Sequence, residues 1–180
     1  MNRRRFVKLI LLAVGAKILG GHTPYGQWVV YRKKHLLIGC HKVDPKTYEL
    51  AKQVVALLAE RLPAAKSRVA RAPGSGRLAS LLGTAQMDVA ILSRSDAAAM
   101  LRGAEHFSAY GPIALRLLIP ISDRLLVARA DLSERHAWLV TGALAGSEVA
   151  PAVAWTGDSV IPWHPGSLAF LEGQPEPGGG

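Results

Sequence analysis

Short apolar runs alternate with helix-like stretches between residues 35 and 92, and this alternation restricts the fold more than any other feature of the chain. The runs 35–39 (HLLIG), 67–72 (SRVARA) and 88–92 (DVAIL) have the length of strands. Strands joined by helices favour parallel pairing through right-handed crossovers. The sequence therefore predicts an α/β fold, a three-layer sandwich built around a mostly parallel sheet.

The clearest helix is expected from Pro45, with Asp44 as its cap and Pro63 at its end. Apolar residues recur on one of its faces at helical spacing: Leu50, Val54, Leu57, Leu58 and Leu62. The residues 40–42 just before it are expected to form a loop. A second helix is predicted to open at the turn Pro73–Gly76 and to bury Leu78, Leu81 and Leu82, and a short one is predicted over 96–102.

The second half is expected to add a hairpin and two more helical segments. The apolar runs 113–121 and 124–130 flank Ser122 and Asp123, a pair typical of a sharp reversal. A helix capped by Ser133 is predicted over 133–145, and a last helical turn over 165–171.

The first 21 residues have the layout of an export signal. They hold five of the 22 basic residues and none of the 13 acidic ones, and their apolar run 9–16 is too short to span a bilayer. Arg3, Arg4, Phe6 and Lys8 resemble the twin-arginine motif, which implies export of a folded protein to the periplasm. An ordinary secretory signal or an uncleaved anchor is the alternative. We expect a single domain over 22–173 and a flexible tail over 174–180.

Nothing in the sequence argues for catalysis, a metal or a cofactor. A single cysteine, Cys40, excludes an internal disulfide and zinc sites built on two cysteines of this chain. Cys40 and His41 form the one tempting catalytic pair, but adjacent residues at a strand end point apart, which favours a passive thiol. The six histidines show no metal-binding spacing. The remaining basic residues are expected to be solvated rather than to bind nucleic acid.

Three segments in order resemble the TAXI-type solute-binding proteins of TRAP transporters. They are Ile38–Gly39 with Tyr48 and Leu50, then Gly74–Ser75 with residues 81–83 and 88–91, and finally the ending 161–167 (IPWHPGS). The resemblance implies a periplasmic receptor with the type 2 periplasmic-binding fold, in which two α/β lobes close on a small ligand, often a carboxylate. This chain is shorter than such receptors, so we expect it to correspond to one lobe, truncated.

If a ligand binds, we expect Lys42, Tyr48, Ser75 and Arg77 to hold it. Lys42 and Arg77 would supply charge, Ser75 and nearby amides hydrogen bonds, and Tyr48 an aromatic wall. The expected ligand is a small carboxylate or other anion, and a membrane permease is the expected partner.

The main alternative is an envelope interaction or assembly protein. The face left open by a missing lobe would then dock another envelope protein or a second copy of the chain, with Trp155 and Trp163 among the exposed aromatic residues. An enzyme that uses Cys40 and His41 is a third, weaker hypothesis.

Overall fold

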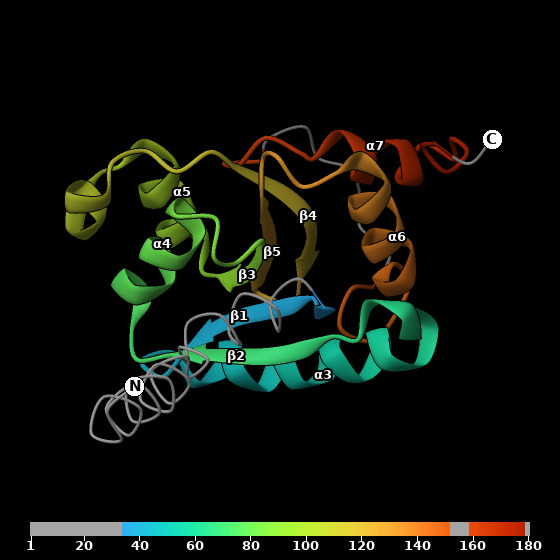
Figure 1. Ribbon diagram of the computed structural model, residues 1–180, viewed down its shortest axis with the longest axis horizontal. Coiled ribbons are helices and arrows are strands. Elements are labelled where there is room, and N and C mark those ends of the chain that lie inside the picture. The colour runs from blue at the N-terminus through green and yellow to red at the C-terminus, as the bar shows by residue number, and fades with distance from the viewer. Residues whose placement is uncertain (1–33, 152–158, 179–180) are drawn as a thin grey trace, which may run out of the picture. The chain divides into compact units, whose positions relative to one another are not determined.

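A five-stranded mixed sheet in the order β2-β1-β3-β5-β4 forms the centre of the domain (Figure 1). The computed structural model describes residues 34–151 and 159–178. The strands are β1 (Leu37–His41), β2 (Arg68–Ala72), β3 (Val89–Leu92), β4 (Leu115–Ile121) and β5 (Arg124–Arg129). The predicted export signal, residues 1–21, and Trp155 lie outside the described residues.

The sheet is only partly parallel, which corrects the expectation of a mostly parallel one. β1 pairs in parallel with both β2 and β3. β5 is antiparallel to its two neighbours, β3 and β4. The predicted hairpin is present, but β5 is inserted between β3 and β4, so β4, which follows β3 through α5 and runs in the same direction, does not pair with it.

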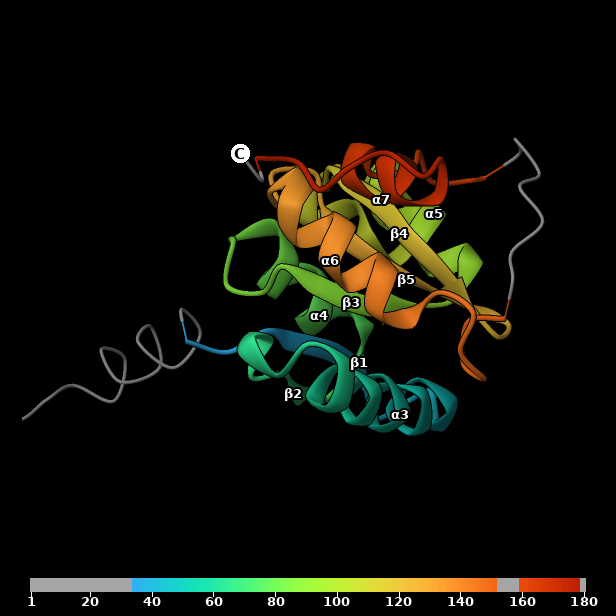
Figure 2. The same cartoon turned by 90° about the vertical axis from the view of Figure 1, so that its right-hand side faces the viewer.

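Helices cover both faces of the sheet, as the three-layer prediction required. α3 (Pro45–Arg61) and α6 (Glu134–Leu144) share one apolar core with the sheet, and α4 (Ser75–Gly83) and α5 (Arg94–Arg102) share the other. In Figure 1, α4 and α5 lie to the left of the sheet and α6 to the right; Figure 2 shows α6 from the front, with α7 (Pro165–Leu171) beside it. Two short 3-10 helices complete the elements, η1 (Pro63–Ala65) and η2 (Glu105–Tyr110).

The predicted starts of α3 and α6 are confirmed by side-chain caps. The side chain of Asp44 accepts a hydrogen bond from the Lys46 amide, and that of Ser133 accepts one from the His136 amide. α5 begins two residues before the predicted start, because Ser93 caps it through the Asp96 amide.

The strand β1 ends later than predicted. Cys40 and His41 were expected in a loop but pair in register with Arg71 and Ala72 of β2. Gly39, which reads as the end of the run, lies inside the strand instead. A Cβ there would overlap the sulfur of Met87 and lie 2.8 Å from Leu78 Cδ1, so a glycine is what allows α4 to pack this closely.

The segment before α7 covers the outer edge of β4. The Leu117 amide donates to the Pro162 carbonyl at 2.9 Å, and the His164 amide donates to the Leu117 carbonyl at 2.8 Å. The Nδ1 atom of His164 accepts from the Gly166 amide and caps α7, while Nε2 lies 2.9 Å from the Leu132 carbonyl. The His-Pro-Gly ending therefore joins α7 to the sheet and to α6.

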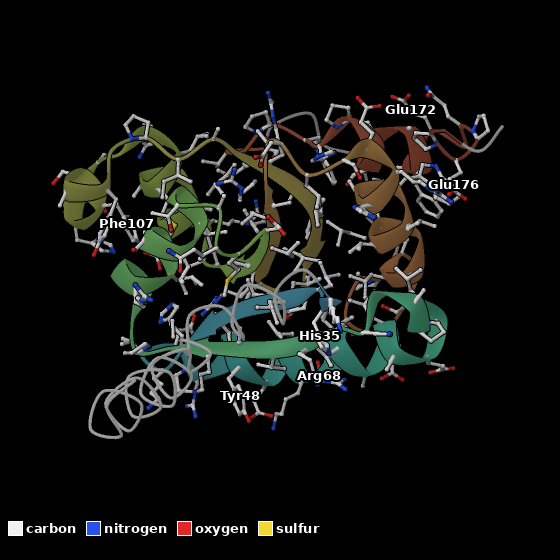
Figure 3. The ribbon with its side chains drawn as sticks, in the orientation of Figure 1. His35, Tyr48, Arg68, Phe107, Glu172 and Glu176 are labelled. Carbon is white, nitrogen blue, oxygen red and sulfur yellow. The ribbon has the colours of Figure 1, made fainter. Side chains whose placement is uncertain are left out.

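The segment after α7 also contacts α6. The indole of Trp138 donates to the Gln174 carbonyl, and Arg135 forms an ion pair with Glu176, which Figure 3 labels beside this helix. Within the described ranges, no helix is long and apolar enough to cross a membrane.

Candidate ligand-binding site

The carboxyl ends of the parallel strands meet at one edge of the sheet, and the chain changes direction there. β1 leads through α3 to β2 on one side, and β2 leads through α4 to β3 on the other side of β1. Ligands of open α/β sheets bind at such a switch point, in the crevice outside the carboxyl ends of the strands. β4 runs in the same direction as β3, so its turn to β5 at Ser122 and Asp123 lies at this edge too.

His41, the last residue of β1, has a buried imidazole with no hydrogen-bond partner in the chain. The residue is 4% exposed, and neither ring nitrogen has a partner. Its backbone is held by the buried hydroxyl of Thr47, which contacts both the His41 amide and its carbonyl at 3.4 Å. Leaving a buried polar group unsatisfied costs about 1–3 kcal/mol, so a partner outside the chain, a water molecule or a ligand, is expected at this ring.

The N-terminus of α4 offers free amides at the same edge. Its cap residue, Gly74, has no side chain to accept from them, whereas side chains cap α3, α5, α6 and α7. The amides of Ser75, Gly76 and Arg77 have no partner among the described residues. Free amides and the positive end of the helix dipole attract an anion.

His41 lies on the face of β1 that α4 covers. Gly39 is two residues earlier and shares that face, and Leu78 of α4 packs against it. From Gly39 to His41 the strand advances by about 6.6 Å toward the carboxyl edge. From Leu78 back to Ser75 the helix advances by about 4.5 Å in the same direction. The end of β1 and the first turn of α4 therefore lie at the same edge of the sheet; we call His41, Ser75, Gly76 and Arg77 the carboxyl-edge site.

Cys40 points to the opposite face and takes no part in this site. Its side chain lies in the core shared by α3 and α6. Burial raises the pKa of the Cys40 thiol to about 11, against an opposing effect of the Arg71 charge. The thiol is therefore protonated at neutral pH and is separated from His41 by the sheet, which argues against a thiolate–imidazole pair.

Ser75, His106 and Asp96 lie together but do not form a catalytic relay. The Nε2 atom of His106 is 3.4 Å from Ser75 Oγ and 3.7 Å from Asp96 Oδ1. A relay needs the two ring nitrogens to face different partners, with the acid on one and the nucleophile on the other. Here one nitrogen serves both, so His106 cannot pass a serine proton toward the aspartate.

The four residues predicted to hold a ligand divide between two faces of the sheet. Ser75 and Arg77 lie at the start of α4, and the Lys42 amide binds the Ala72 carbonyl in the loop beside them. Tyr48 lies on α3, where its ring is stacked by Arg71, 4.4 Å from the ring centroid. In Figure 3, Tyr48 lies beside α3 and β2, away from Phe107 on the α4 side. The structure thus brings Lys42, Ser75 and Arg77 together beside the start of α4, and places Tyr48 in the first turn of α3, on the opposite face of the sheet.

An ion-pair network holds the β4–β5 turn against the start of α3. Arg124 donates to Asp44 at 2.9 Å and to Asp123 at 2.7 Å, and Lys46 contacts Asp123 at 3.2 Å. Burial raises the pKa of Asp44, but the hydrogen bond and charge of Arg124, with smaller effects of the Lys46 amide and His41, bring it below its ordinary value. The carboxylate is thus kept charged at this edge.

A hollow of about 300 Å³ opens at the opposite edge, between the end of α4, the start of β4 and the end of β5. Its lining cation, Arg129, already contacts Asp131, Asp88 and the Leu82 carbonyl. It therefore has little capacity left for an anion. In the part of the chain that the structure describes, no three His, Cys, Asp or Glu residues gather as metal ligands.

No protein-family model and no curated protein matches this sequence.

Proposed function

We propose that this protein is an exported, receptor-like domain that binds a small carboxylate at the carboxyl-edge site. The observation that carries the proposal is the N-terminus of α4, whose first three amides are uncapped, at the edge of the sheet where β1 ends with the buried, unpartnered imidazole of His41. A carboxylate accepts hydrogen bonds on both oxygens, so it can satisfy the imidazole and the amides together. The site is chemically fitted to bind rather than to transform its ligand.

Charge around the site supports an anion. Arg77 and Lys42 are exposed at this edge and carry no ion pair within the described residues. They add long-range attraction without being buried. Asp44 and Asp123, which would repel an anion, are neutralised by Arg124 and Lys46.

The transport role rests on the sequence. The resemblance to TAXI-type solute-binding proteins supports a periplasmic receptor that delivers its ligand to a TRAP-type permease, and the α/β layers with a crossover switch point are compatible with one lobe of a type 2 binding protein. Export is tested by replacing Arg3 and Arg4 with lysine. We expect periplasmic accumulation to stop. Normal accumulation in a strain without twin-arginine translocation would assign the signal to the general secretory route.

A second candidate, an envelope interaction protein, is favoured by two exposed apolar side chains at the same edge. Val43 is 76% exposed and Tyr110 is 44% exposed. They lie next to the first turn of α4, Val43 beside Gly74 and Tyr110 beside Gly76. Such residues at the rim of a half-cleft can contact a second lobe, a second copy or another protein.

Calorimetric titration of the full chain with acetate, pyruvate, succinate and glutamate tests the receptor. We expect one acid to bind, and Arg77→Gln to weaken binding about threefold to tenfold. Lys66→Gln is the matched control, because this exposed lysine precedes β2 at the opposite edge and its loss changes the net charge equally. Gly76→Ala should weaken binding, because its methyl group would displace the Tyr110 hydroxyl beside the first turn of α4. A chain that binds none of the acids and sediments as a dimer would favour the interaction protein.

A further inference from the structure

We infer that the domain docks on an anionic lipid surface through four exposed basic residues that follow the edge strand β2. They are Lys34, Lys66, Arg68 and Arg71, which we call the basic face. The inference goes beyond the proposed function and does not depend on the carboxyl-edge site, because it concerns where the domain is held rather than which ligand it binds.

Charge is divided unequally between the two ends of the sheet. Residues 34–83, which form β1, α3, β2 and α4, contain nine basic and three acidic residues, whereas residues 84–180 contain six basic and ten acidic ones. β2 and β1 lie at one end of the strand order, and β5 and β4 lie at the other. The first two strands and their helices therefore form a positive end of the domain, and such an asymmetry favours a polyanionic partner.

The three acidic residues of the positive end offset little of its charge. Asp44 is held by Arg124, which belongs to the other end of the sheet, and Glu49 forms an ion pair with Lys52 at 2.7 Å. Glu60, near the end of α3, is the third. The four side chains of the basic face are all exposed, and none of them forms an ion pair within residues 34–151 and 159–178. Their charge is thus available to a partner.

The basic face follows the unpaired edge of the sheet. β2 is the last strand on its side, and among the described residues only β1 pairs with it. Arg68 and Arg71 are three residues apart on this strand, so their backbones lie about 10 Å apart. The Arg68 amide donates to the Leu36 carbonyl at 2.9 Å, which brings Lys34 and Lys66 to the start of the same strand. Figure 3 labels Arg68 at this edge.

Neither a second copy of the chain nor a nucleic acid fits the basic face as well as a lipid surface does. Pairing of two β2 edges would bring the arginines of both copies together, and like charges on an edge strand oppose such pairing. Single-stranded nucleic acids need free aromatic rings on which their bases stack. Tyr48 is the one Phe, Tyr or Trp in residues 34–83, and its ring is already contacted by Arg71 and Lys52.

The part of the chain that precedes the domain also favours a lipid surface. Residues 1–33 contain seven basic residues, no acidic residue and the apolar run 9–16, and they join the domain at Lys34, within the basic face. Apolar residues flanked by Lys and Arg bind at lipid interfaces, and clusters of about four to eight basic residues bind anionic headgroups. Both parts of the chain therefore carry the charge that an anionic bilayer attracts.

Sedimentation of the full chain with lipid vesicles measures the docking. At about 0.1 M salt, where the Debye length is about 10 Å, we expect the chain to bind phosphatidylcholine vesicles that contain about 40% phosphatidylglycerol and not to bind phosphatidylcholine alone. At about 1 M salt the Debye length is about 3 Å, and the chain should be released. Equal binding to the two kinds of vesicle, or binding that salt does not weaken, would overturn the inference.

Two matched double variants assign the docking to the basic face. Each basic residue near an anionic membrane strengthens binding by about fivefold, so Arg68→Gln with Arg71→Gln should weaken binding by about tenfold or more. Arg94→Gln with Arg102→Gln removes the same charge from exposed positions on α5, and should weaken it by less than about threefold. Equal affinity of the two variants would overturn the inference, because binding would then depend on the N-terminal segment or on net charge alone.

Two further measurements exclude a folding defect and the other polyanion. Arg68→Lys with Arg71→Lys changes the same side chains but retains both charges, so it should bind as the unaltered chain does. A loss as large as that of the glutamine variant would overturn the inference. Anisotropy titration of a labelled single-stranded oligonucleotide tests nucleic acid. A chain that binds the oligonucleotide and not the vesicles would assign the basic face to nucleic acid instead.

Discussion

Gly166 is the residue at which a single methyl group should do the most damage. A Cβ at this position would overlap the carbonyl oxygen of Glu134 and lie 2.7 Å from its carbonyl carbon. Both atoms belong to the backbone at the start of α6, so no side chain can rotate away. Overpacking typically costs about 1–3 kcal/mol. Because the overlap is with backbone, we take the upper end of this cost, about 3 kcal/mol. Replacing a helical glycine gains at most about 1 kcal/mol, so we expect Gly166→Ala to lose about 2 kcal/mol of stability.

Gly76→Ala is the matched control for this prediction. Gly76 is the second residue of α4, as Gly166 is of α7. Its added methyl group would meet only the hydroxyl of Tyr110, at 2.8 Å, and that side chain is 44% exposed and can move. We expect this variant to be at least as stable as the wild type within about 0.5 kcal/mol.

Urea unfolding followed by tryptophan fluorescence measures both variants, because the Trp138 ring packs against Phe170 of α7 at a centroid distance of 5.1 Å. Thermal unfolding should show a melting temperature lower by roughly 4–8 °C for Gly166→Ala. Equal stability of the two variants would refute the packing argument, and with it the structural explanation of the His-Pro-Gly ending.

Three further predictions concern titratable side chains. Burial lowers the pKa of His164, so the folded chain holds the ring neutral, whereas the unfolded chain takes up a proton below about pH 6.5. The free energy of unfolding should therefore fall from pH 7.5 to pH 5.5, and it should fall less in His164→Asn. Equal pH dependence of the two chains would contradict this prediction. In urea, the free energy of unfolding of Asp44→Ala should be about 1 kcal/mol lower than that of Asp44→Asn. Both variants lose the Arg124 ion pair, but asparagine can still cap α3. A lower stability of Asp44→Asn would contradict the role of this side chain as a cap. The Cys40 thiol, with a pKa of about 11, should resist iodoacetamide at pH 8 in the native chain and react in urea, and rapid native alkylation would show that it is accessible.

Local signals made the helices predictable. The cap at Asp44, the proline that follows it and the apolar spacing through Leu58 all act within a few residues, and α3 has nearly the predicted bounds. The end of β1 was not predictable in this way. In the sequence, Gly39 indicates the end of the strand because glycine weakens strands. In the structure, Met87, 48 positions along the chain, occupies the space where a Cβ of Gly39 would lie. Only the tertiary contact tells the two uses of glycine apart.

Strand order was the second limit. The two apolar runs of the hairpin and the reversal at Ser122 were visible in the sequence, and β4 and β5 pair as expected. Which of the two strands would meet β3 was not visible, because both runs are equally apolar. The structure places β5 there, antiparallel, and β4 is covered on its outer side by the segment that contains Pro162.

The site was predicted in part because only charge and loop position were available. Lys42, Ser75 and Arg77 were chosen as polar residues near predicted helix starts, and they share an edge. Tyr48 is predicted as an aromatic wall of the site, and the first turn of α3 places it on the opposite face of the sheet. His41 was considered only as a partner for Cys40. Once β1 is extended through this residue, alternation along the strand places its ring on the face of Gly39, toward α4.

The His-Pro-Gly ending carries information about packing rather than about a ligand. His164 caps α7 and reaches the Leu132 carbonyl, Pro165 begins the helix, and Gly166 lets α7 approach α6. None of these three residues belongs to the carboxyl-edge site. A resemblance that rests on this ending therefore indicates similar packing of the last helix against the sheet. It gives no information about which ligand binds at the carboxyl edge. Under the proposed function, substitutions at the carboxyl edge should therefore alter carboxylate binding, whereas Gly166→Ala should alter stability.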